Sequence, residues 1–188
     1  MIHELREYVI EREQAPGYFA LFRDVGMPIR GDAYGRLVGN WVVDEGTIRF
    51  LHVWSYASLA ERAEKRAALG KVPEWTGAFL PGAAARVSSQ SITILNPVTG
   101  AESLAHGPRV LHALRCRLAK AAQVAAALAR AHPDADGVWV AECPDPNAVY
   151  LLNRRAGALA DPVELAALGV VNASATALDA GPYRAPLD

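Results

Sequence analysis

The sequence predicts an α+β protein built from two tandem βαββαβ units whose antiparallel sheets face each other. The order of strand-like and helix-like segments is βαββαβ over residues 1–95, and the same order returns over residues 108–180. A short echo supports the repeat, because the pattern HxLR at 112–115 matches the pattern at 3–6. One face of the first sheet is also rich in aromatic side chains, and an exposed face of that kind marks an interface. The second sheet is therefore expected to cover the first.

Composition excludes several classes of protein. The chain has 188 residues, is 52% hydrophobic and carries a net charge of −1, which leaves no electrostatic footprint for nucleic acid or an anionic membrane. No segment approaches the roughly 18 apolar residues that a membrane helix needs. The N-terminal MIHELREY is charged and strand-like, so it is not expected to be a secretory signal. With only Cys116 and Cys143, reduced thiols and a cytoplasmic location are expected.

The first unit opens with an alternating strand at 2–10. From Pro16 the apolar residues fall at i, i+3, i+4 and i+7, which predicts an amphipathic helix that ends at Gly26. A second strand at 35–43 leads through the turn 44–46 into a third strand, FLHVW at 50–54.

A capped helix follows the third strand. Ser58 can accept from the amide of Glu61 while Glu61 reaches back, which is a capping box, and Gly70 supplies the stop. A short helix at 73–80 and a strand at 87–95 complete the unit. This order gives an antiparallel sheet with both helices on one face, which is the ferredoxin-like arrangement.

Residues 96–107 contain Pro, Gly and small polar residues without a period and are expected to form a linker. The second, divergent ferredoxin-like unit contains the helices expected at 120–131 and after Asp161, where a cap, a proline and a glutamate follow in order. Its strands are expected at 111–118, 137–143, 148–154 and 170–178. The predicted division is therefore 1–95, a linker at 96–107, a second domain at 108–180, and a tail at 181–188.

Seven motifs in the first half carry a family resemblance: HELREY, VGMPIR, RLVGNW, HVWSYASLAERAEKRAAL, PEW, FLP and SSQS. In content and order they resemble the NIPSNAP family, within the dimeric α/β-barrel superfamily; the second half carries no such motif beyond LHALR. The resemblance implies that the two antiparallel sheets pair as an α/β-barrel and enclose a cleft. That superfamily includes cofactor-independent oxygenases, isomerases and lyases that act on small molecules, and also haem proteins.

Strand alternation selects the candidate site. If Leu5, Val9, Leu51 and Val53 face the helices, the opposite face lines the space between the sheets. That face is then apolar and aromatic with a few convergent polar groups, as a small-molecule cleft requires. The residues expected there are Glu4, Arg6, Tyr8, Trp41, His52, Trp54 and Gln90, with Arg115 from the second half facing them or bordering the cleft.

Four of these residues are candidates for catalysis. His52 titrates near neutrality and is a candidate general acid or base, and Arg6 is suited to hold a carboxylate, phenolate or enolate. Tyr8 is a candidate donor to a carbonyl, and Glu4 would orient Arg6 or His52. Trp41, Trp54, Gln90 and Arg115 are candidate ligand-binding residues.

Structural roles compete with each of these. A histidine on a strand is more often a hydrogen-bonded structural residue, which is the competing explanation for His52, and Arg6 with Glu4 is also explained as a buried ion pair. Trp41 and Trp54 suit packing between the sheets, and Tyr8 and Gln90 suit hydrogen bonds to their neighbours. These alternatives stay open at the level of sequence.

No bound cofactor is expected. A Gly-rich dinucleotide loop is absent, Glu4 and His52 are too few for a metal site, and one histidine is weak support for haem. Cys116 is expected on the core side with Leu114, and Cys143 near the surface. The expected partners are a small-molecule ligand and a second copy in a homo-oligomer, without nucleic acid or membrane.

Three functions remain open. The first is a cofactor-independent enzyme of the oxygenase, isomerase or cyclase type that acts on an aromatic or polyketide-like compound between the sheets. The second is a protein that binds a small ligand or haem without turnover. The third is an assembly protein whose cleft is filled by side chains.

Overall fold

Eight antiparallel strands form a closed barrel in the computed structural model, which describes residues 1–100, 107–154, 159 and 161–183. The strands are β1 (Ile2–Ile10), β2 (Arg36–Glu45), β3 (Thr47–Tyr56), β4 (Val87–Gly100), β5 (Arg109–Cys116), β6 (Gly137–Cys143), β7 (Ala148–Asn153) and β8 (Val170–Ala180). Their order around the barrel is β1-β3-β2-β8-β5-β7-β6-β4. Strands β1–β4 make one half and β5–β8 the other, so the predicted barrel of two facing units is confirmed.

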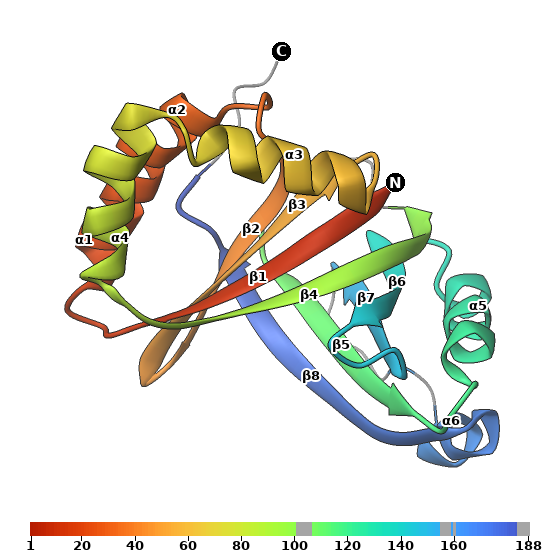
Figure 1. The fold of residues 1–188 in the computed structure, drawn as a ribbon. Helices are drawn as coiled ribbons and strands as arrows, with labels where there is room; N and C mark the ends of the chain where they lie inside the picture. The colour runs from red at the N-terminus through yellow and green to blue at the C-terminus, as the bar shows by residue number, and fades with distance from the viewer. Residues whose placement is uncertain (101–106, 155–158, 160, 184–188) are drawn as a thin grey trace.

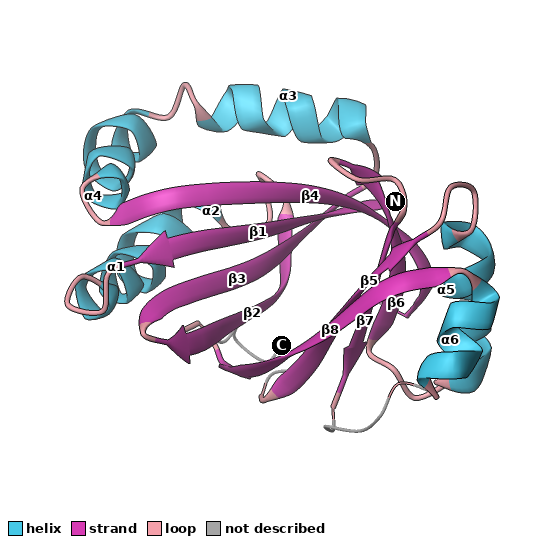
Figure 2. Cartoon of the chain, turned by 90° about the horizontal axis from the view of Figure 1, so that it is seen from below, coloured by secondary structure: helices cyan, strands magenta, loops and turns pink. Residues whose placement is uncertain are grey.

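Two seams join the halves. Strand β4 pairs with β6 along six residue pairs. Among the described residues, β2 and β8 form a shorter ladder, with Trp41 opposite Ala180 and Val42 opposite Asp179. Helices lie outside the barrel on both sides, as Figures 1 and 2 show. They are α1 (Ala15–Leu21), η1 (Phe22–Gly26, a π-helical segment), α2 (Met27–Arg30), α3 (Leu59–Leu69), η2 (Trp75–Phe79, also π-helical), α4 (Leu80–Ala84), α5 (Ala121–Ala131) and α6 (Pro162–Leu168).

The first helical segment runs further than predicted. It passes through Gly26 and ends only at Gly31, whose φ of +47° suits glycine. Gly26 serves packing instead, because a Cβ there would come 2.5 Å from the Phe79 ring. The absence of a side chain lets η1 cross close to η2.

The capped helices form as predicted. The Ser58 hydroxyl accepts from the Glu61 amide at 3.1 Å, and the Asp161 carboxylate accepts from the Val163 amide at 2.7 Å. Strand β4 continues to Gly100, past the expected strand end at Leu95. The expected linker therefore begins as strand, and residues 101–106 of it lie outside the described residues, as do residues 184–188 of the expected tail. The division into two domains stays a prediction.

The barrel interior is a packed apolar core. Its side chains come from both halves: Val38, Trp41, Val43, Leu51, Val53, Leu95, Trp139, Ala141, Leu152 and Leu178, with Leu5, Leu111, Ala148 and Tyr150 against them. A void of only about 20 Å³ lies among them. The expectation that the space between the sheets forms a ligand cleft is therefore wrong, because bulky side chains from both sheets fill it.

A Gly-x-Trp repeat relates the two halves more faithfully than the HxLR echo. Trp41 on β2 and Trp139 on β6 occupy matching strands, and each ring lies over the glycine two residues before it, where a Cβ would overlap it. The echo, by contrast, places Leu5 in the interior and Leu114 on the helix side. The repeat inferred from HxLR is therefore out of register, although the predicted order of elements is right.

Cys116 is buried with Leu114 and Cys143 is exposed, as expected. Across the described residues, every helix is too short or too polar to cross a membrane.

Candidate functional site

The helix-covered face of β1 and β3 collects most of the predicted site. In the strand register Arg6 lies opposite His52, Glu4 opposite Trp54, and Tyr8 opposite Gln90 of β4. That these residues share one face of the sheet agrees with the prediction. The prediction that this face lies between the two sheets is wrong. The side chains pack under α1, η1, α2 and η2 rather than between the sheets. The error arose because the opposite face of Leu5, Leu51 and Val53 is just as apolar and is buried against the other sheet.

Two predicted residues lie elsewhere. Trp41 pairs with Leu51 across β2 and β3, so its side chain points into the barrel, where its indole donates to the Gly107 carbonyl at 3.2 Å. The Arg115 side chain is 70% exposed and forms a surface ion pair with Asp145 at 3.3 Å. Trp41 could not be assigned to a face from sequence, because alternation does not give the register between neighbouring strands. Arg115 lies next to the end of β5 and is exposed there.

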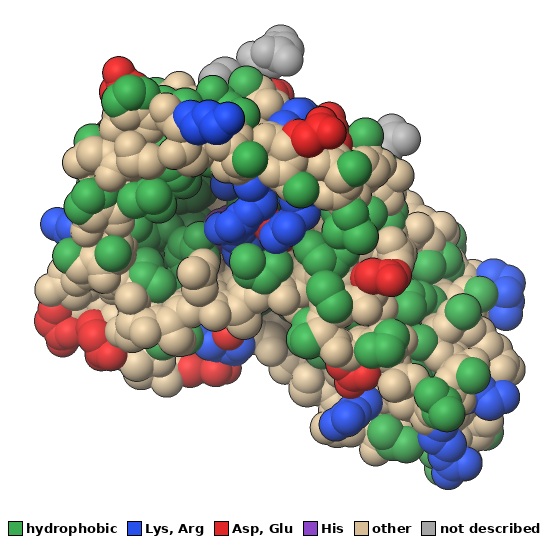
Figure 3. Space-filling model, in the orientation of Figure 1, with side chains coloured by type: hydrophobic (Ala, Val, Ile, Leu, Met, Phe, Trp, Pro, Cys, Tyr) green, Lys and Arg blue, Asp and Glu red, His purple; other side chains and the backbone are tan. Residues whose placement is uncertain are grey.

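A pocket of about 570 Å³ opens between this face and the helices α3 and α4. Figure 3 shows it as a hollow with largely hydrophobic walls and a group of basic side chains at one side. Its lining residues are Arg6, Tyr8, Arg30, Arg66, Leu69, Gly70, Trp75, Phe79, Leu80, Ala83, Ala84, Val87, Ser88, Ser89 and Gln90. Every charged residue in this lining is an arginine, so the pocket favours an anion.

The Glu4 carboxylate fixes the arginines around the pocket. It is fully buried and forms ion pairs with Arg6, with Arg62, and at 3.7 Å with Arg66. Burial alone would lower the pKa of Arg6, but Tyr8 and Glu4 outweigh it and hold that pKa above its ordinary value. One carboxylate thus faces three guanidinium groups, and positive charge is left over at the pocket.

Arg30 closes the same region from α2. Its guanidinium lies 3.3 Å from the centre of the Trp54 ring and donates to the Tyr56 hydroxyl at 2.7 Å. Burial lowers the pKa of Arg30 to about 10, so the side chain is still charged at neutral pH. Arg30 is the last residue of the motif VGMPIR, and nothing in the sequence alone indicates its role.

His52 is held as a neutral hydrogen-bond donor. The indole N–H of Trp54 donates to Nδ1 of His52 at 2.5 Å, so the ring proton must sit on Nε2. Burial, with the charges of Arg6 and Arg30, keeps the pKa of His52 well below its ordinary value. With its free lone pair occupied, His52 is arranged to donate a proton in a hydrogen bond rather than to act as a general base.

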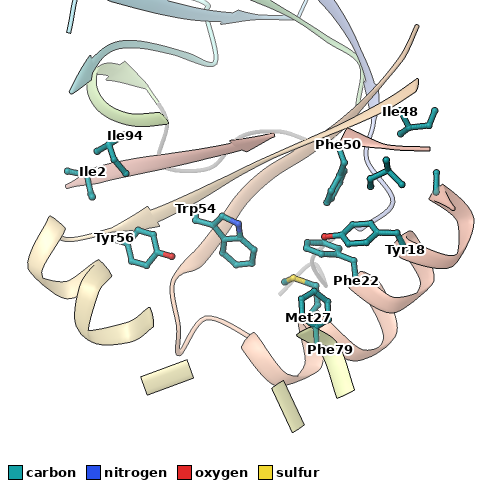
Figure 4. Packing of buried hydrophobic residues seen from close by; sticks show 12 residues of the cluster. Ile2, Tyr18, Phe22, Met27, Ile48, Phe50, Trp54, Tyr56, Phe79 and Ile94 are labelled. Carbon is teal, nitrogen blue, oxygen red and sulfur yellow. The ribbon is translucent and has the colours of Figure 1, made fainter. Parts of the chain in front are cut away.

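A second cavity of about 20 Å³ lies deeper, beside His52. Five residues line both it and the larger pocket: Arg6, Tyr8, Arg30, Trp75 and Phe79. Figure 4 shows the aromatic packing of this region, with Tyr18 and Phe22 from the first helical segment against Phe50 of β3, and Trp54 further along the same strand.

Comparison with known proteins identifies the family of the chain. The family model described as NIPSNAP matches residues 3–101, more than half of the chain. The chain belongs to the NIPSNAP family. Mouse NipSnap homolog 3B is 30% identical over 94 residues, which are 49% of this chain and only 37% of that relative.

Two solved structures resemble the whole barrel. A monooxygenase-like protein from Fusobacterium nucleatum has a TM-score of 0.66 at 9% identity, covering 95% of this chain and 91% of its own. An anthrone oxidase-like protein has a TM-score of 0.57 at 11% identity, covering 95% and 90%. At these identities the likeness establishes the α/β-barrel fold of this NIPSNAP protein and not its chemistry.

Several lining residues were missed at the level of sequence. Trp75 and Phe79 stack with ring centres 4.2 Å apart and form an aromatic wall of the larger pocket. Arg66 belongs to a charged run that, from sequence alone, suits a solvated helix face. The signal was present in the motifs PEW and FLP and in the arginine spacing of 62 and 66, one helical turn, which places both guanidinium groups on the side of α3 that faces Glu4.

No group of three His, Cys, Asp or Glu residues that could hold a metal ion occurs among the described residues. The arrangement also does not suit haem ligation by His52, because Nε2 is enclosed and the cavity beside it measures only about 20 Å³. The expectation that the protein carries no cofactor stays a prediction.

Proposed function

We propose that this NIPSNAP protein binds an acidic aromatic or polyketide-like small molecule in the pocket beneath α3 and α4, and converts it without a bound cofactor. One observation carries the proposal: the buried, charged Arg6 lies in a pocket of about 570 Å³ that has aromatic walls and no acidic residue among its described lining. Such a pocket suits a flat ligand with a carboxylate, phenolate or enolate.

The chemistry follows from charge in a poorly solvated site. Arg6 and Arg30 favour the ionised form of a bound enol or phenol, because charge–charge attraction strengthens as the dielectric falls. Tyr8 accepts a hydrogen bond from Arg6 at 3.0 Å, which leaves its own proton free for the ligand. An electron-rich enolate or phenolate can react with dioxygen or rearrange. The monooxygenase-like and anthrone oxidase-like proteins share this fold, and extending their class of reaction to this chain is part of the proposal.

Binding without turnover is the second candidate function. The observation in its favour is that the described pocket lining contains no carboxylate or free imidazole to act as a base. A substrate would then have to be acidic enough to ionise on binding. A less acidic compound would bind and dissociate without being converted.

The proposal is tested with two probes, 2-naphthoate for binding and anthrone for turnover under air. We expect saturable calorimetric binding of 2-naphthoate, weakened at least tenfold in Arg6→Gln and several-fold in Arg66→Gln, because each loses a charged contact to the carboxylate. Arg49→Gln is the matched control, since Arg49 pairs with Glu7 away from the pocket. A thermal melt of each variant separates loss of binding from loss of fold.

Oxygen uptake with anthrone above the enzyme-free rate supports an oxygenase. Saturable binding of both probes without conversion supports the second candidate. Failure of both probes to bind a folded protein contradicts the proposed pocket.

A further inference from the structure

We propose that the inner cavity beside His52 is an oxyanion site, which takes one negatively charged or carbonyl oxygen of the ligand. His52, Tyr18 and Arg30 supply its hydrogen-bond donors. This inference rests on the proposed function, because the body of the ligand would occupy the larger pocket. The oxyanion site would be a second contact point, so the ligand would need an oxygen atom that reaches the inner cavity.

Three of the residues that line this cavity each carry a buried polar atom without a hydrogen-bond partner. These atoms are Nε2 of His52, the hydroxyl of Tyr18 and Nε of Arg30. The other such atoms among the described residues, on His3 and His112, belong to neither cavity wall. Folded proteins leave few buried donors unpaired, because each lost hydrogen bond is costly. Three around one void therefore indicate a place for an acceptor.

The size and orientation of the site suit a single oxygen atom. A cavity of about 20 Å³ holds one water molecule or one projecting ligand atom. In Figure 4 the Tyr18 hydroxyl points along β3 from Phe50 toward Trp54, and His52 occupies the position between them on that strand face. The inner cavity adjoins the larger pocket, because five residues line both.

All three groups can donate, and two can do nothing else. The proton of His52 sits on Nε2 because Nδ1 accepts from Trp54, and the guanidinium of Arg30 has no lone pair to offer. The positively charged Arg6 and Arg30 both line this cavity, whereas Glu4 is not among its lining residues. An anionic oxygen satisfies this set of groups better than water, which would bring two protons of its own.

The ligand class follows from the two contact points. It should carry an acidic group for the arginines of the larger pocket and, on the far side of an aromatic ring, an oxygen for the inner cavity. A matched pair of probes tests this: 6-hydroxy-2-naphthoate and 2-naphthoate, which differ only in that oxygen. The measurement is calorimetric titration of wild type, Tyr18→Phe and Tyr34→Phe, the last as a control outside both cavity walls.

We expect wild type and Tyr34→Phe to bind the hydroxylated probe about tenfold more tightly than 2-naphthoate. Tyr18→Phe should abolish this preference while binding 2-naphthoate as wild type does, and should melt at the same temperature or higher. Equal affinity of wild type for the two probes would overturn the oxyanion site and leave the proposed pocket intact. So would a preference that survives in Tyr18→Phe, or an ordered water that remains in the cavity of the complex.

A second measurement covers the case in which neither naphthoate binds. Crystals soaked in bromide then report on the inner cavity alone. An anomalous peak within hydrogen-bond distance of His52 Nε2, absent in Tyr18→Phe, supports the site although the proposed function fails. The absence of a peak in wild type overturns the site as well.

Discussion

His3 and His52 are buried in the same manner on opposite faces of the sheet. Each accepts an indole N–H at Nδ1, from Trp139 at 3.1 Å and from Trp54 at 2.5 Å. Each therefore carries its proton on Nε2 and is held neutral. From sequence alone His52 is a catalytic candidate, whereas no pattern indicates a role for His3. Their common geometry shows that a tryptophan neighbour, rather than the strand position, selects the tautomer of each ring.

The neutral state of His3 makes stability depend on pH. Burial, with the charge of Arg36, lowers the pKa of His3 from 6.5 to about 4. As pH falls, His3 is therefore protonated in the unfolded chain at a higher pH than in the folded protein. The contribution to stability is fully present above about pH 6.5 and is lost as pH falls to about 4, at most about 3 kcal/mol.

The measurement is urea unfolding of wild type and His3→Gln at pH 7 and 4.5. The glutamine side chain keeps an acceptor for Trp139 but cannot be protonated, so the unfolding free energy of the variant should fall less over this range. Taking the difference between the two proteins removes the effects of the other titrating groups, including His52. Parallel pH profiles would contradict the prediction.

At the scale of elements, α3 forms one wall of the pocket with little apolar contact. Only Leu69 among its residues is buried. The helix is held instead by its N-terminal cap at Ser58 and by the ion pairs of Arg62 and Arg66 with Glu4. A helix attached in this way opens more easily than one packed by a full apolar face.

Loss of the cap should therefore loosen this wall of the pocket specifically. In Ser58→Ala we expect about 1 kcal/mol less protection of the α3 amides from hydrogen exchange, because the Glu61 amide loses its acceptor. The protection of β1 and β3 should not change. Ser91→Ala, an exposed serine on β4, is the control. Equal loss of protection throughout the barrel would show that α3 does not open by itself.

At the scale of the whole molecule, the interior core is shared between the halves. Neither unit completes it alone, because the first half supplies Trp41, Leu51 and Val53, and the second supplies Trp139 and Leu152. Each half alone would present a large apolar sheet face to water. The closed barrel is the arrangement that buries both faces.

A fragment of residues 1–100 should therefore self-associate or aggregate. Its exposed sheet face is large and apolar, and pairing with a second copy of itself would cover it. Size-exclusion chromatography with light scattering reports the oligomeric state. The full chain is the control, and a well-behaved monomeric fragment would contradict the shared core.

Most secondary structure could be predicted because its signals are local. Capping residues, turns and alternation placed the strands and helices. The features that were missed depend on tertiary contacts, such as the passage of the helix through Gly26 and the extension of β4 to Gly100, where it pairs with β6. The candidate site was predicted in part. Arg6, Tyr8 and His52 share a face as expected, whereas Arg30, Arg66 and Trp75 come from helices whose docking the sequence does not encode locally.

The sequence by itself determined which residues share each strand face, because alternation is a property of the extended backbone. Only the tertiary structure decided what covers each face. Both faces of β1 and β3 are apolar enough to be buried, one under helices and one against the second sheet. The larger interior side chains fill the space between the sheets, and the helices stand off the other face far enough to leave a pocket. Which face is filled and which leaves a pocket depends on the summed volumes of side chains from segments far apart in the chain. A single stretch of sequence does not determine that sum.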